Sequence, residues 1–205
     1  IDILIGTSAF VYDSVFIKHA GLFVIDEEHR FGVKEKEGLL GGVVSKDVLL
    51  MSATPIPRSL NLGLSGLSSI SVLRSPPILR KPIQTFVHYY DDLLIQKAVN
   101  FEVDRGGQVF FVHNNISSIL SIKRYIEKLC PMVSVVVAHA KLSQKELEKN
   151  MLSFISGSTD VLLCTSIIGS GIDIPNVNTI IINLAHRFGL GQLHQIRGRV
   201  GRSNK

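Results

Sequence analysis

The sequence predicts an α/β protein with parallel β-sheets, and two observations carry this prediction. The apolar runs are short, rich in β-branched residues and free of alternating polar residues, which is typical of strands buried on both faces. Stretches with helical spacing lie between several of these runs, and such an alternation favours parallel strands. With 205 residues, 45% of them hydrophobic, the chain can build a core in one large domain or two small ones.

The expected elements follow one another along the chain. The strand-like runs lie at 3–5, 22–25, 48–51, 109–112, 133–137, 161–163 and 179–182. In the expected helix at 116–129, one stripe holds Ile119, Ile122, Ile126 and Leu129. A second helix is expected at 143–155, with a stripe that holds Leu147, Met151, Leu152 and Ile155. Ser143 and Glu146 have the spacing of a capping box at its start.

A proline-rich stretch at 74–82 divides the chain. Three prolines within seven residues cannot continue a helix or a central strand. We therefore predict two units, 1–82 and 83–205, joined by a linker. The second unit has a full alternating set of elements, whereas the first has too few strands to close its own sheet. The first is therefore interpreted as the later half of a domain.

The composition argues against several classes of protein. No apolar run approaches the roughly 20 residues that cross a bilayer, and no charged segment followed by an apolar stretch suggests a secretory signal. Cys130 and Cys164 cannot form a disulfide scaffold and lack metal-ligand spacing, so we expect reduced thiols in the core. The histidines lack the spacing of a zinc site as well. These features favour a cytoplasmic protein with no membrane partner and no zinc.

The net charge of +5 is concentrated near the end of the sequence. Residues 187–205 hold five basic and no acidic side chains. Arg199 and Arg202 are three positions apart, so a helix would place both guanidiniums on one face. Gly198 and Gly201 would then allow a close approach to a phosphoryl group. A solvated basic tail is the plainer alternative, but it has no need of two glycines, which cost about 1 kcal/mol each in a helix.

Three further motifs place polar residues directly after expected strands, where α/β proteins bind ligands. Asp26 and Glu27 follow one strand, and such carboxylates can hold Mg²⁺ and orient an attacking water, although a solvated loop is the alternative. Ser52 and Thr54 follow another strand and could equally cap a helix. Asp173 lies in a glycine-containing loop that can approach phosphate or ribose, or simply form a turn.

In this order, the motifs resemble the motor core of superfamily 2 helicases and translocases. The matching segments are Ile5-Gly-Thr7 (motif Ic), Asp26-Glu-Glu-His29 (II), Ser52-Ala-Thr54 (III), Thr165 to Asp173 (V) and Gln195 to Arg202 (VI). The runs 26–34, 53–58, 106–113 and 173–179 look like those of the bacterial transcription-repair coupling factors. The related RecG-type helicases share parts of these runs, and Arg187 to Leu190 and His194 are more like that relative.

The resemblance implies two RecA-like lobes, the first incomplete and the second complete, in an ATP-dependent motor that moves on double-stranded DNA. Such a motor displaces stalled RNA polymerase and couples transcription to nucleotide excision repair. RNA polymerase and excision-repair proteins would be partners through regions outside these residues. By the same resemblance, Asp26 would hold Mg²⁺, Glu27 would polarise the attacking water, and Arg199 and Arg202 would be arginine fingers.

The other motif residues acquire roles from the resemblance in the same way. The nucleotide would be bordered by Glu28, His29, Gly171, Asp173 and Gln195. Thr7 and Thr165 would contact the DNA backbone, while Ser52 and Thr54 would couple hydrolysis to lobe motion. Because these DNA contacts would be to phosphate, binding should be independent of sequence and sensitive to salt.

Two departures from the family pattern bear on activity. The sequence contains no Gly-x-x-x-x-Gly-Lys-[Ser/Thr] phosphate-binding loop, which in the family precedes the position of Ile1. The chain alone is therefore expected not to hydrolyse ATP and to bind it weakly if at all. Gly169 stands where motif V usually has Glu, which removes a carboxylate that could contact motif VI or DNA. Two alternatives stay open, namely a RecG-type helicase on branched DNA and a non-catalytic module that binds DNA or protein.

Overall fold

The chain forms two compact units, Ile1–Leu73 and Arg74–Lys205. The computed structural model describes residues 2–7, 20–27, 32, 47–52, 69–73, 75, 82–166 and 174–201. The boundary between the units lies at the start of the proline-rich stretch that the sequence analysis singled out.

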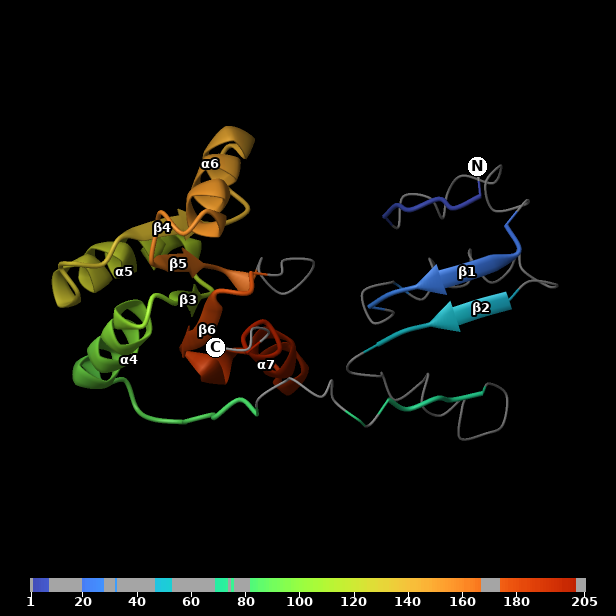
Figure 1. Cartoon of the computed structure of the whole chain (residues 1–205), viewed down its shortest axis with the longest axis horizontal. Coiled ribbons are helices and arrows are strands. Elements are labelled where there is room, and N and C mark those ends of the chain that lie inside the picture. The colour runs from blue at the N-terminus through green and yellow to red at the C-terminus, as the bar shows by residue number, and fades with distance from the viewer. Residues whose placement is uncertain are drawn as a thin grey trace. The chain divides into compact units, whose positions relative to one another are not determined.

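The described part of the first unit contains a parallel pair of short strands (Figure 1). Strand β1 (Leu22–Ile25) pairs with β2 (Asp47–Leu50), with Ile25 opposite Leu50 at their carboxyl ends. The predicted strand at 3–5 is wrong, because residues 2–7 have no regular structure. An isolated apolar run gains no backbone hydrogen bonds unless a neighbouring strand pairs with it, and none of the described strands does so here.

The second unit is built on a parallel sheet, which confirms the predicted α/β class for this part of the chain (Figure 1). Its described strands are β3 (Gln108–His113), β4 (Val135–Ala138), β5 (Val161–Cys164) and β6 (Val177–Asn183). Their order in the sheet is β4-β5-β3-β6, and each neighbouring pair is parallel. All four agree with strand-like runs in the sequence to within a few residues.

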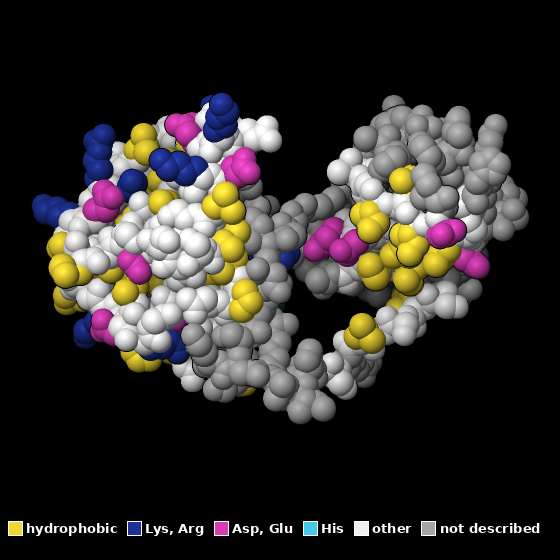
Figure 2. All heavy atoms as spheres, turned by 45° about the horizontal axis from the view of Figure 1, so that its top comes forward, with side chains coloured by type: hydrophobic (Ala, Val, Ile, Leu, Met, Phe, Trp, Pro, Cys, Tyr) yellow, Lys and Arg dark blue, Asp and Glu magenta, His cyan; other side chains and the backbone are white. Residues whose placement is uncertain are grey.

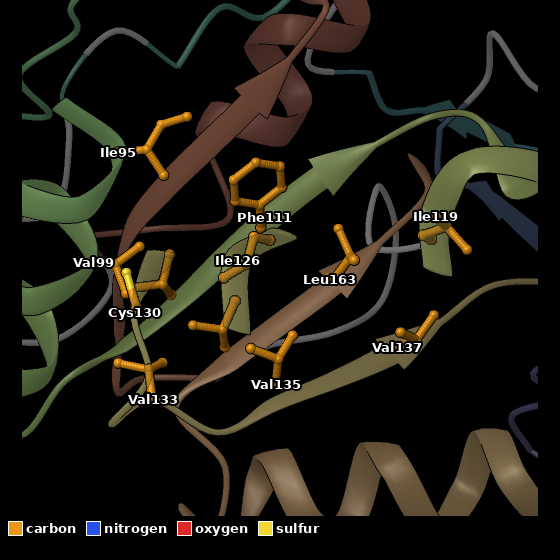
Figure 3. Packing of buried hydrophobic residues seen from close by; sticks show 12 residues of the cluster. Ile95, Val99, Phe111, Ile119, Ile126, Cys130, Val133, Val135, Val137 and Leu163 are labelled. Atoms are coloured by element: carbon orange, nitrogen blue, oxygen red, sulfur yellow. The ribbon is translucent and has the colours of Figure 1, made fainter. Parts of the chain in front are cut away.

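Helices cover both faces of this sheet. The described helices are α4 (Asp92–Asp104), α5 (Ile116–Leu129), α6 (Gln144–Ile155) and α7 (Leu190–Arg197), with a short 3-10 turn η4 (Ala185–Arg187) after β6. Residues of α4 and α5 pack with Val109 and Phe111 on one face (Figure 3). Residues of α6 and α7 pack with Phe110 and Val112 on the other. Alternate side chains of β3 therefore belong to two cores, as expected for a strand buried on both sides.

Local sequence signals explain where the helices begin. Ser143 accepts a hydrogen bond from the amide of Glu146 and the Glu146 carboxylate accepts one from the amide of Ser143, which confirms the predicted capping box of α6. Helix α4 was not among the predicted elements; it begins after Asp91, whose side chain accepts hydrogen bonds from the amides of Leu93 and Leu94. Among the described residues, no helix is both long and apolar enough to cross a membrane.

The two cysteines are free thiols in the core of the second unit, as the sequence predicted. Cys130 is 2% exposed and Cys164 is fully buried. Burial raises the pKa of both thiols, because the thiolate loses its hydration in an apolar environment. Neither side chain therefore has the exposure or the lowered pKa of a reactive cysteine.

Candidate functional site

The order of the strands creates a switch point in the sheet of the second unit. From β3 the chain crosses to β4 on one side, and from β5 it crosses to β6 on the other side. Because the two connections leave in opposite directions, the carboxyl ends of β3 and β5 border the place where parallel α/β sheets bind ligands. The candidate site in this unit is therefore the edge at which these two strands end.

Polar residues gather at this edge. Thr165, the predicted DNA contact, directly follows β5 and is 8% exposed, and its amide donates to the carbonyl of Ala138 (3.3 Å). The Ser166 hydroxyl donates to Asn114 Oδ1 (3.4 Å) and so links the residues that follow β5 and β3. Since Asn114 is exposed and Ser166 half-buried, the edge presents neutral hydrogen-bonding groups to solvent.

His113 joins this edge to its neighbours and was not singled out by the motif analysis. It is the last residue of β3 and is only 3% exposed. Its Nε2 lies 2.8 Å from Ser118 Oγ, and its Nδ1 lies 3.1 Å from Asn183 Nδ2. Burial, and to a smaller extent the positive charge of Arg187, lower the pKa of His113 below its ordinary value of 6.5. The one sequence signal was a histidine at the end of an otherwise apolar strand.

The motif VI segment is organised by α7 and by the turn that follows it. The helix contains Gln195 but ends at Arg197, with Gly198 as its C-cap. Arg199 therefore lies beyond the helix, and the expectation that it occupies a helical face is wrong. Ile196 and Val200 are buried and anchor the segment to the core, while the Arg199 side chain is half-buried.

The two glycines of motif VI have backbone reasons of their own. Gly201 has φ +70, a left-handed conformation that disfavours any side chain, and an added Cβ would lie 3.2 Å from Ile83 Cγ1. At Gly198 an added Cβ would lie 3.3 Å from the carbonyl oxygen of Gln195. The turn itself therefore favours glycine at position 201, and the close approach of Gly198 and Gly201 to phosphate stays a prediction.

In the first unit, the acids of motif II and the serine of motif III lie at one edge. Asp26 and Glu27 follow β1, Ser52 follows β2 by two positions, and the strands end side by side. The Met51 amide donates to the carbonyl of Ile25 (2.8 Å), which extends the pairing beyond β2. The Asp26 side chain accepts a hydrogen bond from the Glu27 amide (2.8 Å), and Asp26 itself is exposed.

Two residues other than glycine have positive φ in the described part of the chain, and both follow strands at carboxyl edges. Glu27 has φ 51 in the first unit, and Leu184 has φ 56 directly after β6 in the second. Such conformations are uncommon for residues with a Cβ and cluster at functional sites. Their positions agree with the edges that the motifs indicate.

The remaining predicted site residues lie in an irregular segment or outside the described ranges. Thr7 is exposed in the segment without regular structure. The residues that lie outside the described ranges are Glu28, His29, Thr54, Gly171, Asp173 and Arg202, together with Gly169. A surface depression of about 940 Å³ is lined by residues 88–92 and by residues of α5, and it contains none of the predicted site residues.

The donor set at the end of β1 suits a hard cation. Asp26 offers exposed carboxylate oxygens, the ligands that Mg²⁺ prefers. Among the residues that the structure describes, no three His, Cys, Asp or Glu side chains gather into a group that could hold a metal by themselves. A magnesium ion here would therefore need ligands from water or from a bound phosphate, and the absence of zinc stays a prediction.

Comparison with known proteins identifies the family. Residues 89–204 match the family model of the helicase conserved C-terminal domain. Over all 205 residues the chain is 50% identical to the transcription-repair-coupling factor of Myxococcus xanthus, and over 204 residues it is 44% identical to that of Escherichia coli strain K12. It covers 17% and 18% of the length of these two relatives. The chain thus spans less than a fifth of either protein.

Solved structures give the same result for the fold. The structure of RecG bound to a three-way DNA junction shares 41% identity at a TM-score of 0.70, over 98% of this chain and 27% of RecG. S. cerevisiae Dbp5 bound to RNA and ADP BeF3 matches at a TM-score of 0.65 over 97% of this chain and 56% of Dbp5. At 16% identity, the second likeness concerns the fold alone.

These matches confirm the resemblance to superfamily 2 helicases and to the transcription-repair coupling factors that the motifs indicated. The similarity to the coupling factors extends over the first unit as well as the second, since the whole chain is aligned. Because the family model covers more than half of its residues, the chain belongs to the helicase conserved C-terminal domain family.

Proposed function

We propose that this chain is a motor segment of an ATP-dependent double-stranded DNA translocase of the transcription-repair coupling type. Such a protein displaces stalled RNA polymerase and couples transcription to excision repair. The observation that carries the proposal is the placement of motif residues directly after strands, at carboxyl edges, in both units. Identity of 50% to a transcription-repair-coupling factor over the whole chain supports the same assignment.

The first unit is, in this proposal, the later half of a RecA-like lobe, with the lobes divided as 1–82 and 83–205. Parallel sheets are normally buried on both faces and have more than two strands. Here Ile25 is buried, but most of the other apolar side chains of β1 and β2 remain exposed, and Figure 2 shows apolar side chains on the surface of this unit. The most exposed of them are Leu22 (57%), Val24 (53%) and Leu49 (50%). Further strands and helices of a longer chain would cover them.

In this proposal, motif residues of this chain would have supporting roles in ATP binding. Asp26 would hold the magnesium ion through its exposed carboxylate, and Glu27 would orient the attacking water. Mg²⁺, when bound, would neutralise negative charge on the phosphates. Arg199 and Arg202 would stabilise the charge on the transferred phosphoryl group. The residues that would border the nucleotide are Glu28, His29, Gly171, Asp173 and Gln195.

DNA would be held through its backbone. Thr165 supports this role because it lies at the switch-point edge beside Asn114 and Ser166. Thr7 would make the equivalent contact from the first lobe, and Ser52 and Thr54 would couple hydrolysis to lobe motion. Neutral donors that contact phosphate give affinity without sequence preference. Double-stranded DNA is therefore the proposed substrate track, and RNA polymerase and repair proteins are proposed partners of regions beyond this segment.

A RecG-type helicase is the second candidate. The structure of RecG on a three-way junction supports it at 41% identity, but identity to the coupling factors reaches 50%. A non-catalytic binding module is a further alternative for the 205 residues by themselves. Since they contain no phosphate-binding loop sequence, we propose that they do not turn over ATP alone. A cytoplasmic location stays a prediction of the sequence.

The test is ATPase activity with and without duplex DNA, measured on the 205-residue chain and on a longer chain that also carries a phosphate-binding loop. The longer chain should be stimulated by DNA, and E27Q and R202A should abolish turnover. E148Q, on the exposed surface of α6, is the matched charge-removing control and should retain it. DNA binding without turnover by the longer chain would favour the binding module, and DNA-stimulated turnover by the 205 residues would refute their proposed inactivity.

A further inference from the structure

His113 lies at the switch-point edge and forms hydrogen bonds to two other elements, α5 and β6. It ends β3 and lies opposite Asn183, the last residue of β6, in the sheet register. On the other side of β3, Val112 lies opposite Cys164, so that Thr165 follows at the level of His113. Through its two ring nitrogens it reaches Ser118 in the first turn of α5 and Asn183 at the end of β6. One buried ring thus connects the end of β3 with α5 and with β6.

The chemistry of the two partners assigns the protonation state of the ring. Asn183 Nδ2 can only donate, so His113 Nδ1 must accept, and the ring proton belongs on Nε2. Nε2–H then donates to Ser118 Oγ. A neutral imidazole with one donor and one acceptor satisfies both partners, whereas an imidazolium has two donors and would set its Nδ1–H against the Asn183 NH2 group, donor against donor, in this amide orientation.

The surroundings favour the neutral ring. Ser118 from α5, Asn183 from β6 and Thr165 after β5 are uncharged, and Arg187 from η4 is the charged group that acts on the ring. Burial and the Arg187 charge both lower the pKa of His113. The connection is therefore intact above the ordinary value of 6.5 and is lost as the pH falls through the lowered pKa.

We propose that His113 is a positioning residue for DNA binding: it holds the carboxyl ends of β3 and β6 and the start of α5 in one arrangement, so that Asn114, Thr165 and Ser166 present a fixed row to the DNA backbone. This inference rests on the proposed function, because it needs DNA at this edge. Asn114 is bonded to Ser166 and is the neighbour of His113 in the chain. A shift of the β3 end would therefore displace the groups that follow both β3 and β5.

Variants of the ring separate its hydrogen bonds from its bulk. H113Q keeps one acceptor and one donor at similar separation and does not titrate, whereas H113F keeps the apolar volume and removes both bonds. S118A removes one partner from the first turn of α5, and S121A, at an exposed position of the same helix, is its matched control. Circular dichroism identifies any variant that fails to fold. If H113F fails to fold, S118A still tests the proposal, because it removes one hydrogen bond of the ring and leaves the histidine in place.

The measurement is fluorescence anisotropy of labelled duplex DNA of random sequence with the 205-residue chain, over a range of pH and salt. We expect H113F to weaken binding roughly tenfold and S118A about threefold, with H113Q and S121A within about twofold of the parent chain. The parent chain should also lose affinity relative to H113Q as the pH falls below 6.5, since only the histidine becomes charged.

The outcomes distinguish this inference from the proposed function. If the parent chain does not bind duplex DNA at all, the proposed DNA contact at this edge fails, and the role of His113 fails with it. If the parent chain binds and folded H113F and S118A bind equally well, the inference alone is overturned. Equal losses in H113Q and H113F, or a pH dependence that H113Q shares, would also overturn it, because they would assign the effect to something other than the two hydrogen bonds.

Discussion

Replacing Gly107 with alanine should strongly destabilise the second unit, for a reason that lies 5 positions earlier in the chain. An added Cβ would lie 1.7 Å from Glu102 Oε1 and 2.7 Å from its Cδ. Glu102 is fully buried and cannot simply move aside, because its carboxylate accepts hydrogen bonds from Arg105 and from the Thr179 hydroxyl. The G107A variant must therefore give up these bonds or shift the backbone at the start of β3.

The size of the effect follows from the bonds at stake. A hydrogen bond to a charged group contributes about 1.5–3 kcal/mol, and breaking a buried ion pair costs about 3–5 kcal/mol. Because the Arg105 side chain is 40% exposed, solvent screens its ion pair with Glu102 and reduces the contribution of that pair to the free energy of unfolding. We therefore expect G107A to lower the free energy of unfolding by about 3 kcal/mol. G106A is the matched control, since Gly106 has φ +74 but nothing within 4 Å of an added Cβ, so it should cost about 1–2 kcal/mol.

Urea unfolding followed by helical circular dichroism measures this loss, because the described helices all belong to the second unit. The E102A variant and the E102A/G107A double variant complete a cycle. Once Glu102 is removed, the added Cβ meets no carboxylate, so G107A should cost less than about 1 kcal/mol in that background. Additive costs, or a loss in G107A no larger than in G106A, would refute the reasoning.

Two smaller predictions concern the capping box and motif VI. S143A should lower the free energy of unfolding by about 1 kcal/mol at neutral pH through loss of the α6 cap. Hydrogen bonds from Ser143 lower the pKa of Glu146 below its ordinary value of 4.5, so the contribution of the Glu146 carboxylate to stability is complete above pH 4.5 and fades as the pH falls below it. Denaturation of S143A and of the parent chain across this range should therefore show the difference between their free energies of unfolding shrinking as the pH falls. A constant difference would contradict this prediction. G201A should cost more than G157A in the same urea assay, because both glycines have positive φ but only at Gly201 does an added Cβ meet a neighbour, Ile83; equal costs would exclude a role for that contact.

Periodicity predicted β3, which is buried along its whole length, and α5, in which Ile119 and Ile126 are buried. For α6 it predicted the helix but not its whole buried face, because Leu152 and Ile155 are 59% and 55% exposed whereas Phe154 is buried. Helix α4 was not predicted because its apolar residues do not lie on one face: Ile95 and Val99 are buried in the core, but Leu93 and Phe101 are each 66% exposed. The strand predicted at 3–5 was wrong for the opposite reason: its residues are apolar, but an apolar run forms a strand only where another strand can pair with it.

The candidate site was predictable where function requires a residue type directly after a strand. Asp26, Ser52 and Thr165 were located in this way. The His113 connection was not, because its partners lie 5 and 70 positions away and only the sheet register brings Asn183 beside it. The left-handed backbone conformation of Gly201 was not predictable either, because it depends on the turn that follows α7.

Gly107 and Gln108, at the start of the run 106–113, show that similarity to a family need not mark chemistry. Gly107 leaves room for Glu102, and Gln108 donates from Nε2 to the carbonyls of Phe154 (2.6 Å) and Thr159 (2.7 Å) at the amino end of the sheet. These contacts make the two residues sensitive to substitution through stability alone. Asp26 differs from these residues, because it is exposed and its side chain accepts a hydrogen bond from the neighbouring Glu27 amide. Residues of the first kind should lose activity only together with folding, whereas residues of the second kind should lose activity in a protein that stays folded, and the second behaviour would identify the chemical residues of the proposed motor.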